Sequence, residues 1–285
     1  FRSTYIAPIL AAEPEAARQI KIDVGRQLRQ AVGEYMLRRT KEEKLQGLPA
    51  KRLFSGDAAS AAGQYLPLLA GVMAGAQLEA YDDIIHGVQA GAGEDRRGAA
   101  LAGLHRLKVV SIHPDIEARL KLPERARELR QQAARSAKMA ALLALLREIE
   151  GRGEKVLIFA TTKAVQAYAA ALIAGLLKVP VEIINGDTRA VASARDAMTR
   201  KAIIDRFQHQ PGFGAIVMSP IAAGVGLTVV GANNVIHLER HWNPAKEAQA
   251  TDRVYRIGQT RDVNVYLPMA LHPDGRSFDL HLNSL

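Results

Sequence analysis

A glutamine and two arginines recur at helical spacing in the C-terminal third of this 285-residue sequence. Gln249, Arg253 and Arg256 are separated by four and then three positions, so on one α-helix they would share a face. Guanidinium groups stay charged, bind phosphate oxygens in a forked geometry and stabilise the charge that develops during phosphoryl transfer. The spacing fits a triphosphate-binding surface. From the spacing alone, arginines that pair with Asp252, with Glu247 or with solvent are the favoured alternative.

The segment around these residues carries signals for both ends of a helix. Asn243 followed by Pro244 is typical of an N-cap and a first helical position, and Gly258 is typical of a C-terminal stop. The pattern therefore predicts one helix over 244–257. An adjacent apolar stripe would seat it on a sheet, through Ala250, Val254 and Ile257.

Short apolar runs alternate with helical segments after Gly153. Strands are expected at 155–160, 181–185, 214–219, 234–239 and 262–267, and further helices at 163–177 and 192–208. This alternation predicts an α/β fold with a parallel sheet and helices on both faces. In such sheets ligands gather beyond the carboxyl ends of the strands, here the loops 160–163, 185–189, 219–228 and 239–243.

Residues 1–150 show a helical pattern, with Ala-rich runs whose apolar residues are spaced by three and four. The clearest helix covers 136–150. The uncharged stretch 58–78 is long enough to span a bilayer, but its glutamines and glycines favour a helical insertion packed on protein instead. The predicted domains are a helical entry segment (1–53), a helical insertion (54–135) and an α/β domain (136–285).

Composition narrows the possible classes of protein. Apolar residues make up 48% and charged residues 24% of the chain, which excludes a disordered or collagen-like protein. Cysteine is absent, which excludes disulfides, thiol catalysis and cysteine-based zinc sites. The net charge of +9 suits an acidic partner such as a phosphate backbone without requiring one.

Two other clusters contain residue types that could bind a metal ion or a nucleotide. His237, Glu239 and His241 have the order H-x-E-x-H, which differs from the zinc-binding H-E-x-x-H, so a polar strand end is favoured and no metal site is predicted. Gly224 and Gly226 lack dinucleotide-binding spacing and fit a tight backbone turn near phosphate. A small-molecule Rossmann enzyme is disfavoured for the same reason.

Several motifs resemble those of the Swi/Snf-type DNA translocases of helicase superfamily two. The run 249–259 resembles motif VI of that family, and Trp242–Glu247 resembles its WNPxxE signature. Further matches follow the family's order over about residues 1–268: Met36–Lys41 with Leu48–Lys51, Ser111–Pro114, Ser136–Met139, Lys155–Ala160 (motif IV), Asn185–Asp187, and Gly224–Leu227 with Ala232–Asn233 (motif V). The chain departs from the pattern at Ser219-Pro220, at Thr228 and in the segment 237–241.

The resemblance implies a C-terminal RecA-like lobe of a motor that hydrolyses ATP with Mg²⁺ and moves along double-stranded DNA. It implies catalytic roles for Arg253 and Arg256, as arginine fingers, and for Gln249. It further implies cofactor contacts by Gly224, Gly226, Asp252 and Gln259, and nucleic-acid contacts by Arg38, Arg39, Lys41, Ser219, Thr228 and Trp242. A solvated basic face remains an alternative for residues 38–41. For Trp242, core packing or bracing of the arginine helix is the favoured alternative.

The chain has no Gly-Lys and no Asp-Glu dipeptide, so it contains neither a phosphate loop nor a DExH box. We expect both in a first lobe upstream of Phe1, which would hold most of the ATP and Mg²⁺, and we expect this chain alone to be inactive. Residues 54–135 could bind a protein partner. The location is predicted to be cytoplasmic or nuclear, with no membrane association. A non-catalytic DNA- or protein-binding module with vestigial motor motifs is the alternative.

Overall fold

The computed structural model describes residues 2–11, 13, 16–32, 47–60, 63–90, 96–116, 123–188, 199–223 and 226–284. The chain divides into two compact units, residues 1–47 and 48–285. Within the smaller unit the described elements are a π-helical turn and two helices: η1 (Arg2–Ile6), α1 (Ala7–Leu10) and α2 (Ala17–Val32). The larger unit contains the sheet and the candidate site.

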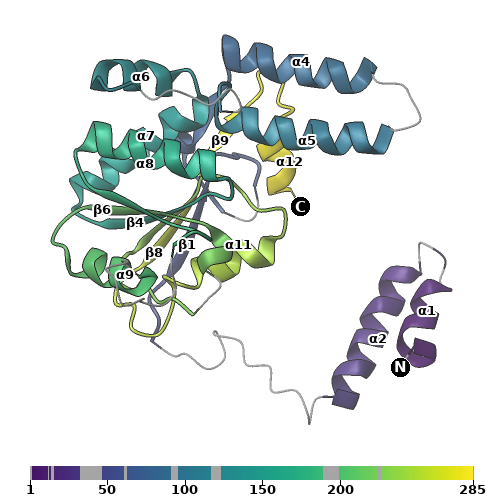
Figure 1. Ribbon diagram of the computed structural model, residues 1–285. Helices are drawn as coiled ribbons and strands as arrows, with labels where there is room; N and C mark the ends of the chain where they lie inside the picture. The colour runs from purple at the N-terminus through teal and green to yellow at the C-terminus, as the bar shows by residue number, and fades with distance from the viewer. Residues whose placement is uncertain are drawn as a thin grey trace. The chain divides into compact units, whose positions relative to one another are not determined.

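A seven-stranded parallel sheet forms the centre of the larger unit, with the strand order β2-β1-β8-β7-β4-β6-β5 (Figure 1). Its strands are β1 (Lys51–Ser55), β2 (Gln64–Tyr65), β4 (Lys155–Phe159), β5 (Val181–Ile184), β6 (Gly214–Met218), β7 (Asn234–His237) and β8 (Val263–Leu267). A second, two-stranded parallel sheet pairs β3 (Ala70–Val72) with β9 (Met269–Leu271).

Helices cover both faces of the main sheet (Figure 1). One face carries α6 (Ala126–Ala134), α7 (Ala137–Gly151) and α8 (Lys163–Leu177), and the other carries α9 (Arg200–His209) and α11 (Pro244–Thr251). Beside the small sheet lie α4 (Ala76–Ala90), α5 (Arg96–Ile112) and α12 (Phe278–Asn283). Two short elements complete the unit, η2 (Pro67–Leu69) and α10 (Pro220–Ala223).

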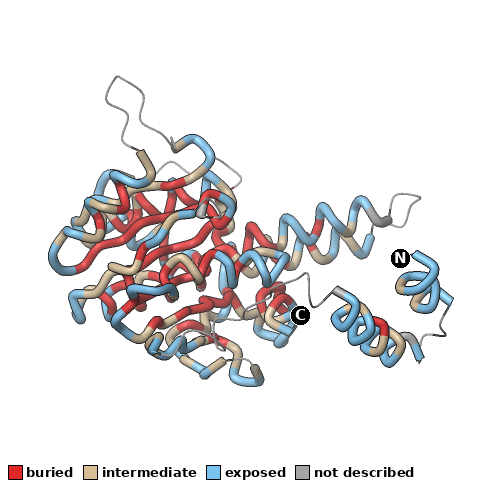
Figure 2. Tube along the Cα trace, turned by 90° about the horizontal axis from the view of Figure 1, so that it is seen from below, coloured by how far each residue is buried: buried red, intermediate tan, exposed pale blue. Residues whose placement is uncertain are grey.

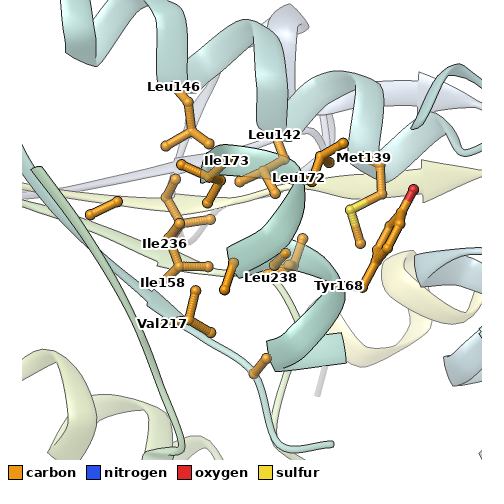
Figure 3. Close-up of a cluster of buried hydrophobic side chains, with 14 of the residues drawn as sticks. Met139, Leu142, Leu146, Ile158, Tyr168, Leu172, Ile173, Val217, Ile236 and Leu238 are labelled. Carbon is orange, nitrogen blue, oxygen red and sulfur yellow. The ribbon is translucent and has the colours of Figure 1, made fainter. Parts of the chain in front are cut away.

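The central strand β4 contributes to two hydrophobic cores at once. Successive side chains of a strand point to opposite faces, so Val156 and Ile158 pack under α7 and α8, whereas Leu157 and Phe159 pack against α9 and α11. Figure 3 shows Ile158 of β4 meeting Leu142 of α7 and Leu172 of α8. Buried residues run through the central strands β4, β6, β7 and β8 (Figure 2), as the continuous apolar run of β4 predicts.

The predicted α/β class, with a parallel sheet and helices on both faces, is confirmed. The helix at 163–177 has the predicted bounds, and the five predicted strands all form with ends shifted by no more than two residues. The predicted helix at 192–208 is present as α9 from Arg200, and residues 189–198 lie outside the described part of the chain.

The helical interpretation of residues 1–150 is wrong for 51–72, where β1, β2 and β3 lie. β1 pairs with β8 from Lys51↔Val263 to Ser55↔Leu267, and Asp262 Oδ1 accepts the Ala50 N–H at 2.9 Å. The stretch 58–78, predicted as a helical insertion, therefore holds β2, η2 and β3 before α4 begins. Pairing with β8 and β9, about 200 positions away, selects β1 and β3, and local periodicity does not reveal such contacts.

The remaining described part of 54–135 is helical, as predicted, in α4, α5 and α6. Because β1 spans Lys51–Ser55, it crosses the predicted limit between 53 and 54; the three domain limits stay a prediction. Among the described residues, no helix has the length and apolarity needed to cross a membrane.

Candidate functional site

The start of α11 has the capping that the sequence predicts. Asn243 Oδ1 accepts a hydrogen bond from Ala245 N at 2.9 Å, and Pro244 occupies the first turn, where a missing N–H costs little. Glu247 is buried in the same turn, and its Oε1 accepts the His241 N–H at 2.7 Å. Side chain and backbone together fix where the helix begins.

The end of α11 differs from the prediction, because the helix stops at Thr251 and not at Ile257. Beyond it the N–H of Val254 bonds to Thr251 O at 2.9 Å, and the N–H of Arg256 bonds to Val254 O at 3.0 Å, so the chain makes successive tight turns. Arg253 O, which a continuing helix would offer to residue 257, instead accepts the Val229 N–H at 2.9 Å. The chain turns with a positive φ of 97° at Gly258.

Gln249, Arg253 and Arg256 therefore do not lie on one helical face. Gln249 is exposed on α11, Arg253 is half-buried, and Arg256 is exposed on the turn that follows. Within the described part of the chain the Arg256 guanidinium has no ion pair and no hydrogen bond. Next to it, the Ile257 side chain is 70% exposed, so it forms no part of the predicted apolar stripe.

The predicted site residues occupy two opposite edges of the sheet. Because the strands are parallel, α11 starts beyond the carboxyl end of β7 and returns to the amino end of β8. The segment Arg253–Gln259, which we call the arginine turn, thus lies at the amino edge, beside the residues that precede β7. The loops after β4, β5 and β7 and the start of the loop after β6 lie at the carboxyl edge, as predicted. The predicted loop 219–228 does not stay there, because it ends at Thr228 beside the arginine turn.

Gln259 braces the arginine turn from inside. Its side chain is buried, its Nε2 donates to Ala232 O at 2.8 Å, and its Oε1 accepts the N–H groups of Thr260 and Arg261 at 3.0 Å. Thr228 immediately precedes Val229, whose N–H bonds to Arg253 O, so this motif V residue lies beside the arginine turn. Its predicted role was a nucleic-acid contact.

The remaining residues of the predicted site are distributed as follows. Gly226 is exposed and has a φ of 63°, which agrees with a tight turn, and Asp252 is half-buried directly after α11. Ser219 follows β6 at the carboxyl edge, where its N–H donates to Ile184 O at 2.9 Å. The remaining predicted residues lie outside the described part of the chain: Arg38, Arg39, Lys41 and Gly224.

Trp242 is 46% exposed, so it is not a core residue, and of the favoured alternative only bracing of the arginine helix is left. Its ring meets Phe278 of α12 edge-on, with the centroids 5.2 Å apart. The indole stands just before α11 at the carboxyl edge, with about half of its surface open to solvent. A nucleic-acid contact by Trp242 and bracing of the arginine helix both stay predictions.

Sequence reasoning missed a buried carboxylate network at the carboxyl edge. Glu239 Oε2 accepts the N–H groups of Thr161 and Thr162 at 2.8 and 2.7 Å, and Oε1 accepts Thr162 Oγ1 at 2.8 Å. Lys108 Nζ of α5 lies 3.0 Å from Oε1 and 3.2 Å from Thr161 Oγ1. Burial alone would raise the pKa of Glu239, but the Lys108 ammonium and these hydrogen bonds hold it below its usual value.

The side chains of His237, Glu239 and His241 do not converge on one point, as the ligands of a metal ion would. His237 is fully buried and its Nε2 lies 2.9 Å from Thr251 Oγ1, Glu239 faces the loop after β4, and His241 Nδ1 accepts the Asn243 N–H. Burial lowers the pKa of His237 to about 4, against the attraction of Glu247, so the imidazole is neutral at neutral pH. No group of three or more potential metal ligands forms among the described residues.

Comparison with known proteins gives the class of this domain. The family model described as "Helicase conserved C-terminal domain" matches residues 137–258. The Zorya protein ZorD of Escherichia coli O139:H28 (strain E24377A / ETEC) is 35% identical over 289 residues, covering all of this chain and 24% of its own length. The putative ATP-dependent helicase/translocase YwqA of Bacillus subtilis (strain 168) is 32% identical over 286 residues, covering all of this chain and 28% of its own length. The chain thus spans about a quarter of these relatives.

Solved structures give the same class. The SWI2/SNF2 ATPase core of Sulfolobus solfataricus in complex with dsDNA superposes with a TM-score of 0.57 at 26% identity, over 95% of this chain and 50% of that one. The C-terminal part of the Fun30 ATPase domain shares the fold, with a TM-score of 0.60 at 22% identity, over 84% of this chain and 90% of that one. The fold and the family model therefore define a RecA-like C-terminal helicase lobe.

Within that class the particular type is also clear. The chain is the C-terminal lobe of a Swi/Snf-type protein of helicase superfamily two, as the motifs predicted.

Proposed function

We propose that this lobe is the second motor lobe of an ATP-dependent double-stranded DNA translocase. In this proposal the arginine turn faces a nucleotide held by an upstream lobe, and the carboxyl edge of the sheet follows a DNA backbone. The relatives named as helicases or translocases support it, as does the dsDNA complex of the archaeal ATPase core.

The observation that carries the proposal is the state of Arg256. Its guanidinium is exposed and lacks a carboxylate partner in the described residues, although Arg256 stands on a turn whose backbone is braced by the buried Gln259. A cation held on a fixed backbone without a local counter-ion is suited to an anion that arrives from outside the lobe. Arg253, three residues earlier, would supply the second guanidinium.

The described residues fit the phosphate groups of an ATP–Mg²⁺ complex but not its magnesium ion. The positive charge of the arginine turn fits phosphate oxygens, and charge stabilisation is the chemistry that the nucleotide demands of this lobe. The described residues bring no set of carboxylates or histidines together as a magnesium site. We therefore assign Mg²⁺ and most nucleotide contacts to the upstream lobe, and we expect the chain alone to be inactive.

The DNA side of the proposal rests on the carboxyl edge. The half-exposed Trp242 indole and the Lys163 side chain, which is 69% exposed, stand there. Ser219 lies at the same edge but is buried. An ammonium group and backbone-directed contacts position a protein on DNA without reading sequence. We propose sequence-independent, salt-sensitive binding.

The test is DNA-stimulated ATP hydrolysis by the full-length protein and its Arg256→Ala and Arg253→Ala variants. An arginine that stabilises the transferring phosphoryl group contributes about a thousandfold or more to the rate, so turnover should fall by that order in each variant. Arg147→Ala is the matched control, because Arg147 is exposed on α7, on the opposite face of the sheet from α11. Circular dichroism checks that each variant folds.

The outcomes separate the two candidate functions. Loss of turnover in the Arg253 and Arg256 variants, with Arg147→Ala unchanged, supports the motor. Wild-type protein that binds DNA without any DNA-stimulated hydrolysis would instead favour a non-catalytic module with vestigial motifs. Near-normal turnover in both arginine variants would refute the role of the arginine turn.

A further inference from the structure

Two lysine–carboxylate pairs are buried in the larger unit, and only one of them reaches the carboxyl edge among the described residues. Lys108 pairs with Glu239, with side chains 8% and 1% exposed, and Lys138 pairs with Asp279, with both side chains 2% exposed. Burying two charges costs several kcal/mol per ion before their attraction is counted, so such pairs contribute little net stability. The Lys108–Glu239 pair therefore calls for an explanation other than stability.

Every contact of the Glu239 carboxylate other than Lys108 goes to the loop after β4. Its oxygens accept the Thr161 and Thr162 N–H groups and the Thr162 hydroxyl, while Lys108 Nζ also donates to Thr161 Oγ1. Thr162 is the N-cap of α8, yet its side chain caps no backbone N–H of that helix. The Glu239 carboxylate fixes the conformation of this turn in its place.

The same carboxylate anchors a second segment of the edge. Glu239 stands two residues beyond β7 and directly before Arg240 and His241, which lead to the half-exposed Trp242. Its own N–H, like that of Leu238, donates to Phe159 O, so the segments after β4 and β7 are joined by backbone as well as side chain. Lys108 supplies the counter-charge from α5, an element outside both segments.

We propose that Lys108 and Glu239 are a positioning pair that holds the loop 161–163 and the segment 239–242 in the geometry that engages DNA. The inference rests on the proposed function. Neither side chain touches DNA itself, because both are buried; they act through Thr161, Thr162, Lys163 and Trp242. Loss of the pair weakens DNA engagement while leaving the arginine turn at the opposite edge intact.

The experiment uses DNA-stimulated hydrolysis by the full-length protein, with Lys108→Met, Glu239→Gln and the double variant. Misplacement of a binding loop can weaken the interaction it makes by about one to two orders of magnitude. The DNA concentration for half-maximal stimulation should therefore rise about tenfold in each single variant. The turnover at saturating DNA should stay within about twofold of the wild-type value, because the variants weaken DNA binding without changing the chemical step. Because the two residues act as one unit, the double variant should be no worse than either single variant.

Lys138→Met is the matched control. It removes an equally buried ammonium from a carboxylate, but its partner Asp279 lies in α12 and accepts the Ala270 N–H in the small sheet. We expect Lys138→Met to lower the melting temperature without changing the DNA requirement. If it raises the DNA requirement as much as Lys108→Met does, or if the single effects add in the double variant, the proposal is wrong.

A milder variant tests the proposal if Lys108→Met or Glu239→Gln does not fold. Thr162→Val removes the hydroxyl bond to Glu239 Oε1 with little change in volume. It should raise the DNA requirement about threefold, less than the tenfold expected for loss of the pair, because the two backbone N–H bonds to Glu239 remain. An unchanged requirement in this variant contradicts the proposal.

Hydrogen exchange separates this inference from the proposed function. The amides of Thr161 and Thr162 should exchange faster in Lys108→Met than in Lys138→Met, because their acceptor loses its counter-charge. If the wild-type protein shows no DNA-stimulated hydrolysis, the proposed function fails, and exchange still decides whether the pair positions the loop. Equal exchange in the two variants overturns the positioning role.

Discussion

Arg240 and Glu247 form a largely buried ion pair across the start of α11, with Arg240 Nε 2.8 and 3.0 Å from the two carboxylate oxygens. The Arg240 and Glu247 side chains are 11% and 10% exposed. Burial alone would raise the pKa of Glu247, but the hydrogen bonds and charge of Arg240 and the bond from the His241 N–H hold it below its usual value. The pair ties the segment after β7 to the helix that leads into the arginine turn.

Replacement of one member of this pair should therefore be costly. Glu247→Ala leaves the Arg240 guanidinium and the His241 N–H without their acceptor, and removal of one partner from a buried pair costs about 3 kcal/mol. Urea unfolding of the lobe measures the change. Glu182→Ala is the control, because Glu182 pairs with Arg206 on the surface and such pairs contribute at most about 1 kcal/mol. Similar losses in both variants would contradict a structural role for Glu247.

The C-terminal half of the fold was predictable because its signals are local. β4 is a continuous apolar run flanked by glycine and a polar turn, and α8 follows at once, so alternation defines the sheet without knowledge of distant contacts. The N-cap at Asn243 was predictable for the same reason. By contrast, β1 depends on its pairing with β8, which lies about 200 residues away.

The candidate site was predictable in residue types and not in geometry. The pattern around Gln249 favoured a helix to Ile257, but the bond from Val229 to Arg253 O and the Gln259 side chain end α11 at Thr251. Val229 and Gln259 lie outside the helix, so the periodicity of the helical segment does not predict their contacts. The sequence around Lys108 is likewise compatible with a solvent-exposed lysine, because only tertiary packing brings its ammonium group to Glu239.

The buried His237 should make the lobe sensitive to mild acid. Burial lowers its pKa to about 4, whereas an unfolded histidine has a pKa near 6.5, so the unfolded state binds the extra proton between these values. The contribution of this group to stability is complete above about pH 6.5 and is lost as the pH falls toward 4. We expect a loss of about 2 kcal/mol between pH 7 and pH 5.

His237→Gln tests this prediction by denaturant unfolding at pH 7 and pH 5. Glutamine can still bond to Thr251 but does not titrate, so the variant should lose much of the pH dependence. His105→Gln is the control, because His105 is exposed on α5. A variant at position 237 that keeps the full wild-type slope would show that other groups cause it.

Gln259→Ala should loosen the arginine turn. The change leaves Ala232 O and the N–H groups of Thr260 and Arg261 without partners, at a cost of about 2 kcal/mol in unfolding free energy. If Gln259 acts by holding Arg256, kcat for ATP should fall while the KM for ATP changes little. A rise in KM with an unchanged kcat would instead indicate direct contact with the nucleotide. Gln210→Ala, which removes one bond to Phe213 O after α9, is the control.

Lys163→Ala should weaken DNA binding in a salt-dependent manner. Lys163 is the first residue of α8 at the carboxyl edge, and its ion pair with Asp187 is exposed, so that pair contributes little and can yield to a phosphate. Each lost phosphate contact releases one counter-ion fewer, so the slope of log K against log salt should decrease by about one. Fluorescence anisotropy with duplex DNA at several salt concentrations measures that slope. Arg147→Ala removes the same charge from the C-terminal part of α7, which leads into the amino end of β4, whereas Lys163 follows its carboxyl end, so this variant should leave the slope unchanged. Equal slopes for all three proteins would place the DNA away from the loop after β4.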